Sequence, residues 1–154
     1  MKRNKFALLL LLSLGAAAVR AADVPDSKVT PGLVDPTLTA QVLCAAGFST
    51  TTIRNVTEST KKQVYQRYNV QNHAGYCSGP QGCEIDHLIS LEIGGKNDIQ
   101  NLWPQPYDGT WNAHMKDQLE NRLHKLVCAG QLPLSQAQKE ISTDWRAAYQ
   151  KYMK

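Results

Sequence analysis

The 154-residue sequence has no Cys-x-x-Cys pair, no internal repeat and no apolar run long enough for a comfortable membrane span. Without a Cys-x-x-Cys pair, a structural zinc site with the usual ligand spacing is disfavoured. The longest apolar run covers residues 6–18, whereas a membrane helix needs about 20 residues. No shift in composition marks a second domain. We therefore expect one domain that does not span a membrane.

The N-terminal residues have the order of a secretory signal peptide. A basic segment, MKRNK, precedes the apolar run, and Val19 and Ala21 fit the small-residue pattern before a cleavage site. This order predicts cleavage after Ala21 and export to the periplasm or out of the cell. An uncleaved anchor is the alternative, which the short run disfavours. Residues 22–154 then form a single domain of sufficient length for a modest core.

Acidic and basic residues balance in the predicted mature chain. Four of the 17 Lys and Arg residues lie in the signal segment, whereas all 13 Asp and Glu residues follow it. The zero net charge carries no overall signature of nucleic-acid binding. Locally, residues 84–108 have a net charge of −4, and residues 54–67 and 116–154 each have +3. This distribution suits a cation held near a polyanion, and a simple scatter of surface charge explains it equally well.

Export makes disulfide bonds the expected state of the four cysteines. Four cysteines allow three pairings. Cys77 and Cys83 bracket the turn-rich segment SGPQG, which favours a short disulfide there. Cys44 and Cys128 would then connect an early helix to a late one.

The apolar pattern predicts a mainly helical chain with one strand–loop–strand region. Helices are expected over 36–47, 57–68, 110–129 and from Ser135 onward, strands over 48–57, 84–90 and 101–106, an extended leader over 22–34 and a long turn over 69–83. Asp35 and Thr57 are the expected N-caps of the first two helices, and Ser135 and Gln138 form a candidate capping box. We expect the last two helices to pack against each other.

The stretch EIDHLISLEIGGKNDIQNLWPQ, residues 84–105, places an acid directly before a histidine. Imidazole is the usual general base near pH 7, and a carboxylate is a ligand for hard cations such as Mg²⁺. Neighbouring residues on a strand point to opposite faces, so Asp86 and His87 can serve one site only if the strand ends there. The pattern therefore predicts a strand end at this pair.

The order Asp86-His87, Gly94-Gly95, Asn101-Leu102 and then a helix resembles the HNH nucleases, a ββα-metal family, over about residues 84–120. The resemblance implies an α+β fold, with a ββα-metal finger embedded in a small, mainly helical, disulfide-stapled domain. It also implies His87 as general base, Asp86 as metal ligand, and Asn101 as the residue that braces the loop and orients His87. The paired cysteine motifs of many members are missing here.

The resemblance places another metal ligand on the helix that follows. On a helical wheel, Asn112 lies about 20° from the centre of the apolar face and His114 about 140° from it. A carboxamide oxygen suits Mg²⁺, which makes Asn112 the predicted ligand and His114 the alternative if the helix begins later.

Basic residues near the motif are candidates for contacts with phosphate. Lys116 lies one turn beyond Asn112, and Arg54 precedes the basic helix 57–68. We expect both to bind substrate. For Arg54, Lys61, Lys62 and Arg67, a solvated helix face is the alternative and the simpler explanation.

The signal segment together with the resemblance implies an exported, monomeric, Mg²⁺-dependent endonuclease that hydrolyses phosphodiester bonds in DNA, or also in RNA, with little sequence specificity. One alternative is a non-catalytic protein of this fold that binds nucleic acid or the cell envelope. Another is a metal hydrolase of a different substrate, such as a cell-wall amide.

Overall fold

The computed structural model describes residues 23–70 and 82–154. The predicted signal peptide and most of the predicted long turn lie outside these residues. The helices are α1 (Ala40–Leu43), α2 (Glu58–Arg67), α4 (Ala113–Cys128) and α5 (Leu134–Tyr152), and the strands are β1 (Cys83–His87) and β2 (Leu102–Pro106). Three 3₁₀ turns connect them: η1 (Thr50–Thr52), η2 (Leu91–Ile93) and η3 (Ile99–Asn101).

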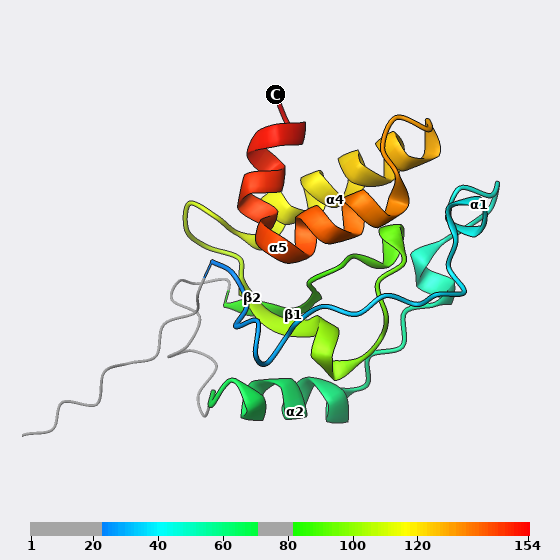
Figure 1. The fold of residues 1–154 in the computed structure, drawn as a ribbon. Coiled ribbons are helices and arrows are strands. Elements are labelled where there is room, and N and C mark those ends of the chain that lie inside the picture. Colours follow the sequence, from blue (N-terminus) through cyan, green and yellow to red (C-terminus); the bar gives the residue numbers. More distant parts are fainter. Residues whose placement is uncertain (1–22, 71–81) are drawn as a thin grey trace, which may run out of the picture.

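The two strands lie between α2 on one side and the α4–α5 pair on the other (Figure 1). They pair antiparallel, with Cys83 opposite Pro106 and His87 opposite Leu102. The strand–loop–strand–helix order predicted from the sequence is confirmed, and the domain is a small α+β fold. No helix among the described residues is long and apolar enough to cross a membrane.

The main core lies between α4 and α5, as predicted from their apolar stripes. Leu119 and Leu123 of α4 pack with Ile141 and Trp145 of α5, and all four are fully buried. Burial of such side chains contributes about 1.5–3 kcal/mol each to folding. The pair thus provides a stable platform behind the strands.

The extended leader makes backbone contacts that the sequence pattern did not indicate. Its backbone bonds to the loops that connect β1 and β2: Gly32 N donates to Gln100 O at 3.1 Å, and Asp35 N donates to Gly94 O at 2.9 Å. In return, Lys96 N donates to Leu33 O at 2.9 Å. The leader therefore holds the loop that follows the Asp-His pair.

Each glycine of the Gly94-Gly95 pair in this loop is required for a different structural reason. Gly94 ends η2 with a φ of +80°, a conformation that favours glycine. At Gly95, a Cβ atom would lie 1.7 Å from Ile89 O, so no side chain fits. The motif thus reflects a tight turn and a close backbone contact.

Two predictions near the first helices are wrong. The first helix has only the four residues of α1 and is capped by Thr39. Asp35 accepts instead from the backbone N and the hydroxyl of Thr37, which closes an earlier turn. Residues 48–57 contain η1 rather than a strand, because Ser49 bonds the backbone of its neighbours locally.

The start of the last helix also differs from the prediction. α5 begins at Leu134, and Pro133 at its N-cap makes no side-chain cap bond. Gln138 donates to Ile93 O at 2.8 Å, so its side chain serves tertiary structure rather than a capping box. The prediction for α2 is confirmed, because Thr57 Oγ1 accepts from Thr60 N.

The predicted disulfide between Cys44 and Cys128 is present and ties the end of α1 to the end of α4. Cys83 is also disulfide-bonded, and its predicted partner, Cys77, lies outside the described residues. Because 84 residues separate Cys44 from Cys128, the bond restricts a large part of the unfolded chain.

We expect the double variant Cys44→Ala/Cys128→Ala to lose about 2–5 kcal/mol of unfolding free energy, because its unfolded chain gains loop entropy. Urea unfolding followed by circular dichroism measures this loss. The variant His124→Ala, which keeps the disulfide and changes a neighbouring side chain, is the control. An unchanged midpoint in the double variant would contradict the assigned role of the disulfide.

Candidate active site

Asp86 and His87 lie at the end of β1, as predicted. Leu88 leaves the strand and donates its N–H to Asn101 O at 2.8 Å. The Asp86 carboxylate faces α4, where it meets Lys116, and the His87 ring faces the loop that carries Asn97. The strand end thus presents an acid and an imidazole in adjacent positions.

Asn97 holds the His87 ring. The Nε2 atom of His87 lies 3.0 Å from Oδ1 of Asn97. Asn97 Nδ2 donates to Ile53 O at 2.5 Å, which fixes the carboxamide with its oxygen toward the ring. The Nε2 atom must therefore carry the proton, and Nδ1 keeps the free electron pair. Of the two ring nitrogens, Nδ1 is the one that can accept a proton.

The surroundings keep His87 neutral. Burial, which leaves the residue 2% exposed, is the main cause that lowers its pKa below the ordinary 6.5. The Asp86 charge and the bond to Asn97 raise the pKa by less, and the positive charges of Arg54 and Lys116 lower it further. A neutral imidazole at pH 7 is what a general base requires.

Asn101 braces the loop, as the resemblance implied, and is fully buried. Its Oδ1 accepts from Ile89 N at 3.0 Å and from Leu33 N at 3.3 Å. Its Nδ2 donates to the carbonyl oxygens of Ile89 and Lys96, at 2.9 and 3.0 Å. These four bonds use the whole carboxamide, so the contact that orients His87 comes from Asn97 instead. Sequence reasoning missed Asn97 because it lies among other polar loop residues.

Lys116 is buried at the centre of the site and is not exposed to a substrate phosphate, contrary to the prediction. Its ammonium group donates to Asp86 Oδ2 and to His87 O, both at 2.6 Å, and also to Glu120 Oε1. These three bonds use all three protons of the ammonium group. Lys116 thereby joins the end of β1 to α4.

Opposing effects set the protonation of this buried cluster. Burial alone would lower the pKa of Lys116, but the charges of Asp86 and Glu120 outweigh burial and raise it above its ordinary value. Burial raises the pKa of Glu120, and the charge of Lys116 counteracts that rise. The lysine therefore stays charged, and the pKa of Glu120 remains raised on balance.

Asn112 caps α4 and does not lie on its inward face. Its Oδ1 accepts from Met115 N at 3.1 Å, and its Nδ2 donates to Gly109 O at 3.0 Å. The oxygen predicted to bind a metal thus serves the helix terminus. α4 begins later than expected, at Ala113, and the alternative His114 is exposed with its ring 5.4 Å from that of Tyr107.

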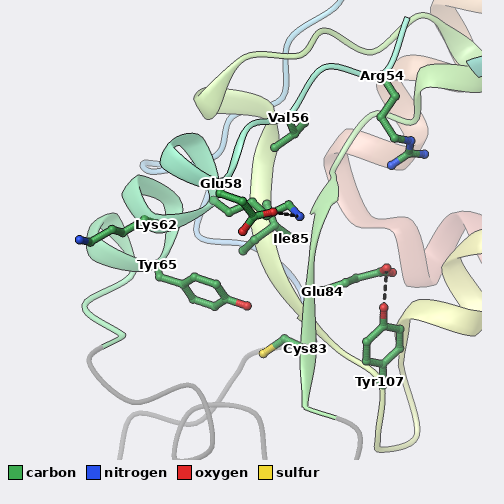
Figure 2. Close-up of a pocket in the computed structure, with 10 residues that line it drawn as sticks. Arg54, Val56, Glu58, Lys62, Tyr65, Cys83, Glu84, Ile85 and Tyr107 are labelled. Atoms are coloured by element: carbon green, nitrogen blue, oxygen red, sulfur yellow. Dashed lines mark hydrogen bonds and ion pairs between the residues drawn. The ribbon is translucent and has the colours of Figure 1, made fainter. Parts of the chain in front are cut away.

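Further carboxylates surround Asp86. Glu84 lies two residues before it on β1 and accepts a hydrogen bond of 2.8 Å from the Tyr107 hydroxyl, as Figure 2 shows. Asp117 follows Lys116 on α4. Burial raises the pKa of both Glu84 and Asp117, and the Asp86 charge raises each further. The site therefore holds excess negative charge, which favours a cation.

The carboxylates around Asp86 do not bring three ligand atoms together in the part of the chain that the structure describes. Among the described residues, one group of three possible ligands has its donor atoms within 4.8 Å of one another, namely Cys44, His124 and Cys128. The disulfide uses both thiols of that group. Mg²⁺ is commonly bound by one or two carboxylates together with waters and substrate phosphate, so it does not need such a group of three protein ligands.

Arg54 is the predicted phosphate-binding residue that the structure places near the site. Its charge lowers the pKa of His87 and of Asp117. Lys61 pairs with Glu58 at 2.7 Å, and Arg67 donates to Val29 O at 2.7 Å, so both have partners within the protein. Arg54 is therefore the cation best placed to meet an anion beside His87.

Comparisons of the chain with protein-family models, curated proteins and solved structures find no match. The chemistry of the site therefore carries the functional argument.

We expect Lys116→Met to lose about 3–5 kcal/mol of unfolding free energy at neutral pH, because it leaves two buried carboxylates without their cation. Burial already raises the folded-state pKa of Glu120, and loss of the Lys116 charge raises this pKa further, so the folded variant gains stability when it binds a proton. The loss should be smaller at pH 5 than at pH 7.5. Denaturant unfolding at both pH values measures it.

Lys61→Met is the matched control, because it removes a lysine from an exposed ion pair. Its cost should stay below about 1 kcal/mol. Equal losses in the two variants, or a larger loss for Lys116→Met at pH 5, would contradict the role assigned to the buried ammonium group.

Proposed function

We propose that the protein is an exported, metal-dependent endonuclease that hydrolyses phosphodiester bonds in DNA, and in RNA as a second substrate. The observation that carries this proposal is the neutral, buried imidazole of His87, whose Nε2 is held by Asn97 and whose Nδ1 is free to accept a proton. It stands beside Asp86 in a cluster of carboxylates with excess negative charge.

In this reaction, Nδ1 of His87 takes a proton from the attacking water. The Asn97 carboxamide holds the ring during the transfer and stabilises the imidazolium through Nε2. General-base catalysis of this kind contributes about 10²–10⁴-fold to the rate.

Asp86 and Asp117 are the proposed ligands of a divalent cation, with Mg²⁺ as the metal. Bound there, the cation supplies Lewis-acid stabilisation of the phosphate and of the leaving oxygen. Lys116 holds Oδ2 of Asp86, and Oδ1 makes no hydrogen bond within the described part of the chain. The lysine thus orients the carboxylate and leaves one oxygen for the metal.

Arg54 would bind the substrate through a phosphate next to the scissile bond. Low sequence specificity follows if no helix reads base edges in the major groove.

The disulfide between Cys44 and Cys128 is typical of exported proteins, which supports a periplasmic or secreted location. The proposed protein acts as a monomer.

We expect the oxidised protein to nick plasmid DNA with Mg²⁺ and to stop when EDTA is added. His87→Ala should lower kcat by about 10²–10⁴-fold and leave DNA binding intact. Circular dichroism controls for folding. Folded protein that cleaves neither DNA nor RNA with Mg²⁺ or Mn²⁺ would overturn the proposal in favour of a binding protein, and release of peptide from cell-wall material would favour an amidase.

The pH profile tests His87 separately. Because the pKa of the base is lowered, kcat/KM should stay high down to about pH 6.5 and fall only under more acidic conditions. Arg54 lowers this pKa, so Arg54→Gln should move the acidic limb to higher pH. An acidic limb above pH 7 in the parent, or a shift to lower pH in Arg54→Gln, would argue against His87 as the base.

A further inference from the structure

An open groove of about 870 Å³ lies between α2 and β1 (Figure 2). Tyr65 of α2 forms part of one wall, and Glu84 and Tyr107 lie on the other side of β1. The described part of the sheet has only two strands, so the edge of β1 away from β2 is unpaired. Cys83, Glu84 and Ile85 of this strand line the groove.

The groove opens next to the candidate active site, because the two share residues. Arg54 lines the groove, and its charge also acts on His87 and Asp117. Glu84 lines the groove two residues from Asp86, on the same face of β1. A ligand that reacts at His87 can therefore extend into the groove.

The charges of the groove suit an anionic ligand. Glu58 is paired with Lys61 at 2.7 Å, and Glu84 accepts the hydrogen bond from Tyr107. Lys62 stands at the rim and points away from the groove in Figure 2. Arg54, Lys61 and Lys62 line the groove and outnumber its two carboxylates by one positive charge. The pair of Lys61 with Glu58 is exposed, so a phosphate can take the place of Glu58 beside Lys61.

The groove also offers aromatic surface. Tyr65 is partly buried and reaches from α2 toward β1, where it packs with Cys83 and Val70. Aromatic rings are platforms on which the bases of single strands stack without sequence preference. Cationic and aromatic side chains in one groove are the combination that non-specific single-strand binding uses.

We propose that this groove binds the unpaired DNA strand that continues from the scissile phosphate. The inference rests on the proposed function, because it takes the ligand to be the substrate of the same site. A volume of this size matches pockets for compact ligands, roughly 300–1,000 Å³, and holds a short stretch of one strand. In a duplex the bases pair and stack on one another, so they are not available to stack on Tyr65.

The test measures binding rather than cleavage, so it is independent of hydrolysis. A fluorescein-labelled DNA oligonucleotide of about 12 nucleotides, within the usual range of single-strand sites, is titrated with His87→Ala protein by fluorescence anisotropy. We expect the single strand to bind at least about tenfold more tightly than the duplex of the same sequence.

Additional substitutions in the His87→Ala background then locate the site. Tyr65→Ala should weaken single-strand binding by about tenfold, and Tyr65→Phe, which keeps the ring, should not. Lys61→Gln should reduce the slope of log Kd against log salt by about 0.7, as expected for one lost phosphate contact. Lys139→Gln, on the exposed surface of α5, is the control and should change neither quantity.

The inference is overturned if both Tyr65→Ala and Lys61→Gln bind the single strand with the affinity and salt dependence of the His87→Ala protein. Equal affinity for single strand and duplex would overturn it as well. Lys61→Gln keeps the test decisive if Tyr65→Ala fails to fold. If the proposed hydrolysis itself is wrong, the parent protein does not nick plasmid DNA. The binding assay does not depend on cleavage, so the two outcomes can be told apart.

Discussion

The buried ammonium group of Lys116 is the interaction on which the arrangement of the site depends. It joins Asp86 and the His87 carbonyl at the end of β1 to Glu120 on α4. A buried lysine is tolerable only with such partners, because an unpaired charge away from water is costly. The strand end and the helix are therefore held in one position relative to each other.

A second set of contacts holds the imidazole from the opposite side. The leader bonds to the loop between the strands, Asn101 uses its whole carboxamide within that loop, and Asn97 reaches the ring. Gly95 allows the backbone to approach so closely that no Cβ fits. His87 is thus positioned by segments far apart in the sequence, as a preorganised base requires.

The electrostatics of the site follow from this geometry. Burial and the nearby cations keep His87 neutral, whereas burial and mutual repulsion raise the pKa of Glu84 and Asp117. A neutral base beside carboxylates with excess negative charge favours chemistry that uses a cation together with an activated water. The groove along β1 begins at the same residues, which links the proposed reaction to the proposed path of the strand.

The sequence by itself determined the elements whose causes are local. Thr57 begins α2, apolar periodicity forms α4 and α5, and the Asp-His pair ends a strand, because caps and periodic burial act over a few residues. Tertiary structure alone decided which polar side chains meet. Asn97 rather than Asn101 holds His87, Lys116 is buried rather than exposed, and Asn112 caps α4, because these contacts depend on how distant segments pack.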